Sequence, residues 1–139
     1  MRLALKILNS DASLNCFTYL NQLSITRGET TKLVFQLCDK DQNMQRVIAG
    51  SSATVEISIP RSYVVAAAPS GSTRLTTDYS IARTASPLNA LDRSIWFIAL
   101  SADDTKTLIS NSINVTLTDG VNVSIASLNA AIRIQDNQD

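Results

Sequence analysis

Carboxylates are the side chains of this chain best suited to chemistry, because the sequence contains no histidine. Without histidine there is no Ser-His-Asp or Cys-His arrangement, and the commonest general base is missing. Asp103, Asp104 and Asp119 are acids of the kind that glycoside hydrolysis uses, but that reaction needs two carboxylates across a cleft. Asp103 and Asp104 fit a helix start better, and Asp119 fits a turn. We therefore expect no catalytic residues and no enzymatic activity.

A possible metal loop begins at Asp39-Lys40-Asp41-Gln42-Asn43, which has the start of a calcium-binding pattern. That pattern requires glycine where this chain has Met44, and a bidentate glutamate where it has Gly50. A polar hairpin loop explains the segment better. The four glycines are isolated, so there is no glycine-rich phosphate loop. The sequence thus predicts neither a metal nor a cofactor.

Composition indicates one folded domain with no bulk electrostatic attraction to polyanions. The chain has 139 residues, is 45% hydrophobic and 17% charged, and carries 12 basic and 12 acidic residues. A general nucleic-acid binder would normally be basic, and no apolar run approaches the length of a membrane span. We expect neither nucleic acid nor membrane as a partner. Cys16 and Cys38 are too few for a disulfide scaffold, which favours synthesis in a reducing cytoplasm.

Alternation of apolar and polar residues predicts a fold made of strands. We expect about seven to nine strands and one short helix, Ser101 to Ile109, with Ser101 as its cap. The fold class is an all-β, Ig-like antiparallel β-sandwich. It forms a single domain over residues 1–139, with a polar C-terminal tail from Gln135 to Asp139. The clearest strands are Thr31–Cys38, Ala53–Ile59, Ser94–Leu100, Ile113–Thr118 and Val121–Ala126. Pro60 ends the second of these or marks it as an edge.

A hairpin joins the last two of these strands at Asp119-Gly120. A two-residue Asp119-Gly120 loop would place Leu117 opposite Asn122 and so mix apolar and polar groups on one face. A three-residue loop that begins at Thr118 places Leu117 opposite Val121. Because a one-residue slip exchanges the two faces, the burial pattern favours the three-residue loop.

The strand around Trp96 is apolar on both faces, whereas a sandwich strand normally buries one. Its faces are Ile95, Phe97 and Ala99 on one side, and Trp96, Ile98 and Leu100 on the other. Either the helical turn and the 60–92 connection cover the second face, or another subunit covers it. Aromatic residues are enriched at interface centres, so Trp96, Ile98 and Leu100 are the candidate interface residues.

Two segments of the chain carry a resemblance to a known family. The first is Gly28–Leu37 with the polar loop and Ala53–Ile59 that follow it. The second is Asp92–Thr105 with the later hairpin at Thr118-Asp119-Gly120. Their order resembles the N-terminal β-sandwich modules of tailed-bacteriophage virion proteins, such as baseplate upper proteins that carry receptor-binding fibres. The resemblance covers roughly residues 25–135 and rests on patterns of strand and turn.

The resemblance implies a non-enzymatic virion structural protein that docks onto neighbouring subunits. We expect no fibre or receptor-binding domain after the module, which favours a tail, baseplate or neck adaptor, or a capsid decoration protein. We expect synthesis in the bacterial host cytoplasm, other virion proteins as partners, and a homo-oligomer or many copies in a particle. Contacts would form near Trp96 or by strand addition at an exposed sheet edge. The alternative is a carbohydrate- or host-surface-binding β-sandwich module.

Overall fold

The structure is a computed structural model that describes residues 1–13, 15–66, 75–90, 92–106, 108 and 111–136, with the backbone alone for 60–66 and 75–80. Apart from one short helix and one 3-10 turn, its regular secondary structure is β, which confirms the predicted all-β sandwich. The structure contains more strands than the seven to nine that we predicted, because several of its strands are very short. The elements are β1 (Leu3–Leu8), β2 (Tyr19–Leu20), β3 (Leu23–Thr26), β4 (Thr31–Asp39), η1 (Lys40–Gln42), β5 (Gln45–Arg46), β6 (Thr54–Ala66), β7 (Leu75–Thr84), β8 (Ser86–Asn89), β9 (Asp92–Leu100), α1 (Ala102–Lys106), β10 (Ile113–Asp119), β11 (Asn122–Leu128) and β12 (Ile132–Gln135).

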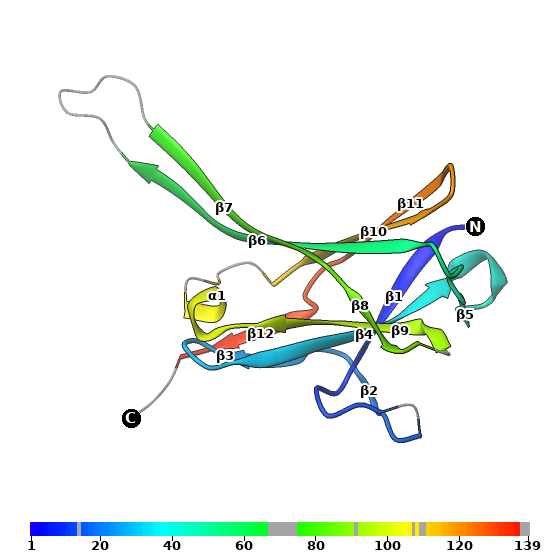
Figure 1. The fold of residues 1–139 in the computed structure, drawn as a ribbon. Helices are drawn as coiled ribbons and strands as arrows, with labels where there is room; N and C mark the ends of the chain where they lie inside the picture. The colour runs from blue at the N-terminus through cyan, green and yellow to red at the C-terminus, as the bar shows by residue number, and fades with distance from the viewer. Residues whose placement is uncertain (14, 67–74, 91, 107, 109–110, 137–139) are drawn as a thin grey trace.

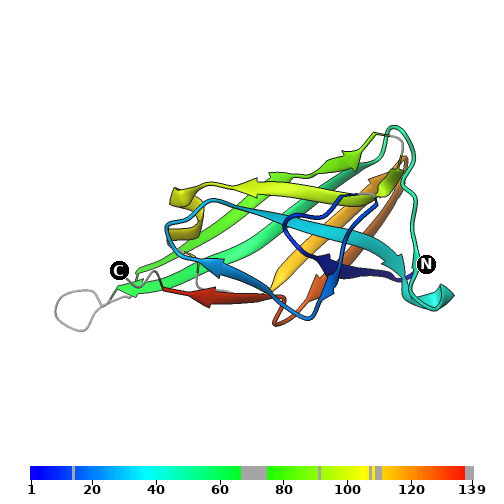
Figure 2. The same cartoon turned by 90° about the horizontal axis from the view of Figure 1, so that it is seen from below.

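Two antiparallel sheets pack face to face (Figures 1 and 2). The larger has the order β2-β1-β4-β9-β8, with β5 also paired to β4, and the smaller has the order β11-β10-β6-β7. A separate parallel pair, β3 and β12, joins early and late parts of the chain. Within the described residues, no helix has the length and apolar character needed to cross a membrane.

The core between the sheets contains the face of β9 that we predicted as an interface. The side chains of Trp96, Ile98 and Leu100 are 2%, 3% and 1% exposed and belong to the main apolar cluster. The Trp96 indole Nε1 donates a hydrogen bond of 2.9 Å to the Arg93 carbonyl oxygen. The chain itself therefore covers these residues, and the structure does not present them to a partner.

The second apolar face of the larger sheet is covered from within the chain as well. Leu8, Val34 and Ile95 form a small buried cluster on that face. Phe17, from the loop between β1 and β2, and Leu88 of β8 pack against it. The cover thus comes from residues before β2 and from the predicted 60–92 connection, and α1 is not part of this cluster.

The β10–β11 hairpin differs from our prediction. Asp119 pairs with Asn122, and Leu117 faces Ser124, so the loop is the two residues Gly120 and Val121. Gly120 has a φ of +64° and Val121 is not among the residues with positive φ, which matches a type II′ turn with glycine first. The predicted three-residue loop is wrong, and the slip turns the odd-numbered residues of β11 outward.

Pro60 lies inside β6 and does not end it. The strand continues to Ala66, with a shift in its pairing to β7 between Pro60 and Ser62. Strand β10 pairs with β6 only over Thr54–Ser58. Beyond Ser58, β7 is the one strand that pairs with β6 among the described residues, so a residue without an N–H is tolerated there, as the edge alternative predicted. The β6–β7 ribbon extends past the rest of the sheet (Figure 1).

The predicted helix start is confirmed. Ser101 accepts a hydrogen bond of 3.1 Å from the Asp104 N–H through its hydroxyl, and Asp104 accepts one of 2.9 Å from the Ser101 N–H. This reciprocal arrangement is a capping box. At the C-terminal end, Gln135 belongs to β12, so the predicted polar tail starts later than we expected, and residues 137–139 lie outside the described part.

Candidate functional site

Two of the three carboxylates that suggested hydrolysis, Asp104 and Asp119, have structural partners and do not converge. Asp104 is buried and forms an ion pair of 2.9 Å with the Arg83 guanidinium, in addition to its role in the cap. Asp119 accepts a hydrogen bond of 3.3 Å from the Gly50 N–H at the β10–β11 hairpin. Helix α1 and this hairpin lie at opposite ends of the sandwich (Figure 1). The two carboxylates therefore do not face each other across one cleft.

The segment that resembled a calcium loop is a compact polar turn. The Asp39 side chain caps η1 by accepting a hydrogen bond of 2.9 Å from the Asp41 N–H. Asp41 pairs with the Arg2 guanidinium at 2.6 Å and with the N-terminal amine at 3.7 Å. The hydrogen bond from Arg2 lowers the pKa of Asp41. The Asp41 carboxylate is thus paired with cations of the chain, and the Asp39 carboxylate accepts backbone hydrogen bonds. The described residues contain no group of three or more metal-binding side chains.

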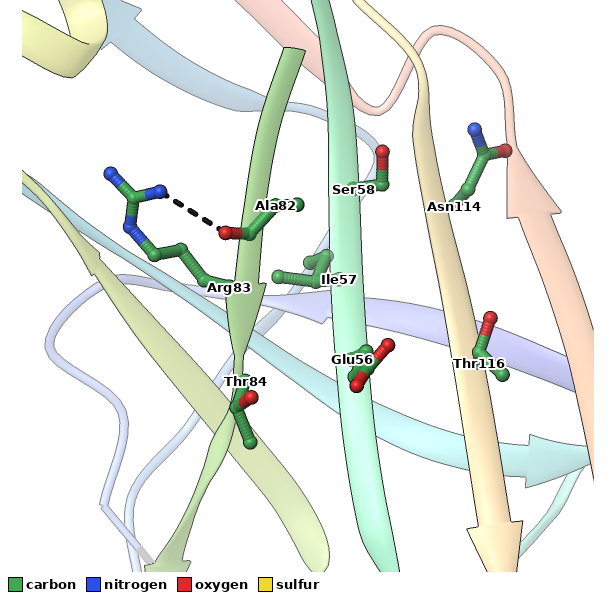
Figure 3. Close-up of a pocket in the computed structure, with 8 residues that line it drawn as sticks. All are labelled: Glu56, Ile57, Ser58, Ala82, Arg83, Thr84, Asn114 and Thr116. Atoms are coloured by element: carbon green, nitrogen blue, oxygen red, sulfur yellow. Dashed lines mark hydrogen bonds between the residues drawn. The ribbon is translucent and has the colours of Figure 1, made fainter.

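A shallow hollow lies on the outer face of the smaller sheet (Figure 3). It has a volume of about 240 Å³, and Glu56 of β6 supplies its carboxylate. Arg83 of β7 donates to the carbonyl oxygen of Ala82 at 3.1 Å and to Asp104 at 2.9 Å, so its cation is directed to groups of the chain. One carboxylate beside hydroxyl and amide groups offers hydrogen bonding but no acid–base pair.

The thiols do not supply a nucleophile with a matching base. Cys38 is buried in β4, where burial raises the pKa of its thiol, which disfavours the reactive thiolate. Cys16 is exposed and unpaired, in a chain without histidine. The structure thus describes no arrangement of the activated-nucleophile type at either cysteine.

The strongest candidate site is an apolar surface along the outer face of β11, which we call the β11 stripe. It consists of Val121, Val123 and Ile125, whose side chains are 97%, 58% and 69% exposed. The hairpin register produces this exposure, because the even-numbered residue Ala126 is the one buried in the core. On β10, the outward neighbours of the stripe are Thr118 and Thr116.

Sequence reasoning missed the β11 stripe because it assigned these residues to the core. One feature pointed to the alternative, because a Gly-Val loop with glycine first satisfies the type II′ turn. The segment from Gly120 to Ile132 contains no charged residue and no proline, although strand edges usually carry one or the other, so its composition did not mark β11 as an end strand.

Aromatic side chains do not form an open platform for a sugar ring in the described part of the chain. Tyr19 is the most exposed of the described aromatic side chains, at 49%. The Lys6 ammonium lies 4.7 Å from its ring centre, and the Phe17 ring packs against it edge to face at 5.3 Å. Its hydroxyl also donates to Gln36 at 2.9 Å. These contacts leave little of the ring for stacking.

Comparison with known proteins adds no relationship to this geometry. No protein-family model matches the chain, and no curated protein matches it significantly. The site must therefore be interpreted from the residues and contacts described above.

Proposed function

We propose that the protein is a non-enzymatic structural component that works through protein–protein contacts. The observation that carries this proposal is the β11 stripe, in which Val123 and Ile125 are exposed on an end strand of a sheet and Val121 is exposed in the adjoining hairpin loop. Contiguous apolar side chains on a soluble surface mark interaction sites, whereas single exposed ones do not. Burying a Val or Ile side chain fully contributes roughly 1.5–3 kcal/mol, so the stripe represents roughly 3–6 kcal/mol before the cost of association.

The class of assembly that we propose is the virion of a tailed bacteriophage. The support for this step is the resemblance of residues 25–135 to virion β-sandwich modules. In this proposal the protein is made in the bacterial host cytoplasm and enters the particle in many copies. It serves as a tail, baseplate or neck adaptor, or as a capsid decoration protein, and its partners are other virion proteins.

The test of this proposal is the composition of purified particles. Particles of the phage that encodes the chain are separated by density, and the copy number of the chain is measured by quantitative mass spectrometry. We expect a fixed copy number in every preparation. Presence of the chain in the infected lysate but not in particles would contradict the proposal. Specific binding of the purified protein on a glycan array would favour the carbohydrate-binding alternative instead.

A second experiment tests whether the β11 stripe makes the contact. Lysine is introduced at Val123 and Ile125 together, and the matched control carries lysine at Thr116 and Thr54, which lie on the same face of the sheet in β10 and β6. Circular dichroism checks that both variants are folded. We expect the stripe variant to be lost from particles and the control to be retained. Normal incorporation of the stripe variant would place the contact elsewhere.

A further inference from the structure

The outer part of the β6–β7 ribbon pairs only with itself among the described residues. Strand β6 pairs with β10 only as far as Ser58. Beyond Pro60, five residue pairs join β6 to β7 alone. We call these two segments, Ser62–Ala66 and Leu75–Tyr79, the outer ribbon. Both views show it projecting past the end of the larger sheet (Figures 1 and 2). A two-stranded ribbon without a third strand or a covering layer is marginally stable in water.

Pro60 marks the boundary between the outer ribbon and the rest of the sheet. Proline has no N–H, so it donates no hydrogen bond to the ladder at this position. The register of β6 with β7 also shifts between Pro60 and Ser62, which makes Arg61 the extra residue of a bulge. A bulge disrupts the ladder locally and bends the strand that contains it. The two parts of the ribbon are therefore only weakly coupled across this point.

The two parts of the ribbon also differ in the residues that lie opposite each other. On the inner side of the bulge, Ile59 pairs with Ile81, and their side chains are 0% and 1% exposed in the main apolar core. In the outer ribbon, one of the five pairs, Ala66 with Leu75, is apolar on both strands. The pairs that best stabilise a ladder, aromatic with β-branched residues or opposite charges, do not occur there. The inner part is thus anchored by the core, and the outer ribbon is not.

We propose that the outer ribbon opens and closes as a unit of its own, with Pro60 as the hinge, while the rest of the sandwich stays folded. Opening breaks the hydrogen bonds between β6 and β7 beyond the bulge and leaves the pair of Ile59 and Ile81 in the core. Proteins open locally in such cooperative units, and units with few buried contacts open at the lowest free energy. The fold thereby carries an arm that changes its shape without loss of the core.

Hydrogen exchange followed by NMR tests the opening for each amide of the full chain. Amides that exchange only by global unfolding are protected by a factor of about 10³ or more. We expect such protection for Glu56–Ser58, where β6 has a paired strand on both sides. For every amide of the outer ribbon we expect a protection factor below about 100. A larger factor at any amide of the outer ribbon would overturn the proposal.

Low concentrations of urea separate local opening from global unfolding. The effect of urea on an opening reaction scales with the surface that the reaction exposes. Because the outer ribbon exposes little surface when it opens, its exchange rates should stay constant within about twofold below the unfolding transition. The protection of Glu56–Ser58 should fall steadily over the same range. An equal dependence on urea in both segments would mean that the ribbon opens only with the whole sandwich, and would overturn the proposal.

A disulfide across the outer ribbon tests whether its two strands pair when it is closed. Val64 and Thr77 are partners in the register, and paired Cα atoms of an antiparallel ladder lie about 4.5–5.5 Å apart, within disulfide range. The variant carries Val64→Cys and Thr77→Cys, with Cys16→Ser to remove the exposed thiol. Its reduced form is the matched control. We expect oxidation to raise protection in the outer ribbon by about tenfold or more and to leave that of Glu56–Ser58 unchanged. Equally fast exchange in the oxidised form would contradict the pairing of these strands, and with it the proposal.

Brief digestion with trypsin gives an independent measurement at the hinge. Arg61 is the extra residue of the bulge, whereas Lys32 is an exposed residue of β4 that pairs with Ala99 of β9. Because a protease needs a locally unfolded segment, we expect cleavage after Arg61 to be at least about tenfold faster than cleavage after Lys32. Arg61→Gln removes the first site and checks the assignment of the fragments. Cleavage after Lys32 at the same rate or faster would overturn the proposal.

The outer ribbon is separate from the contact surface of the proposed function. It lies at the other end of the smaller sheet from the β10–β11 hairpin (Figure 1). A ribbon that does not open would therefore leave the role of the β11 stripe intact. A chain that is absent from virions would likewise leave the hinge at Pro60 intact.

Discussion

Replacing Trp96 by alanine tests the core directly, because Trp96 has the largest fully buried side chain of the described residues. Removal of a buried tryptophan costs about 3–5 kcal/mol in lost transfer free energy and cavity formation. Domains of this kind unfold with a free energy of about 5–15 kcal/mol. We therefore expect Trp96→Ala to lose between a fifth and nearly all of its stability, independently of any partner.

A phenylalanine variant separates packing from hydrogen bonding. The Arg93 carbonyl oxygen accepts both from the Trp96 indole at 2.9 Å and from the Ala49 N–H at 3.1 Å. Trp96→Phe removes the indole donor but leaves this carbonyl with its second donor. The expected loss is therefore smaller, about 1–2 kcal/mol.

Urea unfolding followed by far-ultraviolet circular dichroism measures these differences. Trp96 is the single tryptophan of the chain, so its fluorescence reports unfolding of the wild type in parallel. The matched control is Ile125→Ala on the exposed β11 stripe, for which we expect a change within about 0.5 kcal/mol. Truncation of a buried tryptophan costs more than about 1 kcal/mol. A Trp96→Ala variant whose free energy of unfolding lies within about 1 kcal/mol of the wild-type value would therefore refute the assignment of Trp96 to the core.

Three further changes have distinct expected results. Ser101→Ala removes the cap of α1 and should lower the free energy of unfolding by about 0.5–2 kcal/mol, whereas Ser51→Ala in an exposed turn should change it by less than about 0.5. Arg2→Gln should raise the pKa of Asp41 towards its ordinary range, as followed by NMR titration of the carboxyl. Because the lowered pKa stabilises the fold above about pH 4 and this contribution disappears as the pH falls through the folded-state pKa, the variant should lose less stability on acidification. An unchanged Asp41 titration would contradict the pairing. Ala130 has a φ of +57°, so Ala130→Gly should stabilise by up to about 1 kcal/mol, whereas Ala131→Gly at its buried neighbour should destabilise. Equal effects at the two positions in thermal unfolding would contradict this reasoning.

Local sequence patterns were sufficient to predict those strands and turns whose structure depends on residues close together in the chain. The alternation in Ala53–Ile59 predicted the first part of β6, the alternation in Ile113–Thr118 predicted β10, and Ser101 predicted the start of α1. Each of these depends on neighbours within a few residues.

The sequence did not decide features that depend on distant packing. Both hairpin registers give alternating faces, and the choice depends on what lies opposite β11. Small inward residues, Ser124 and Ala126, occupy the side where β1 approaches, and the larger Val123 and Ile125 are left outside. Trp96 was a candidate interface residue because both faces of its strand are apolar, and the loop that contains Phe17, which covers the other face of the larger sheet, has no clear pattern of its own.

The parallel pairing of β3 with β12 has a consequence for how the chain folds. Gln22 donates a hydrogen bond to the Ala130 carbonyl oxygen over a sequence separation of 108 residues, and Ile132 pairs with Leu23 beside it. Contacts of such separation must close a long loop before they contribute stability, so folding is slow compared with that of a helical domain of equal size. During synthesis, Leu23 and Ile25 lack their β12 partner until the last strand leaves the ribosome. The side chains of Leu23 and Ile25 therefore gain their β12 neighbours late in folding, after most of the other strands have been made.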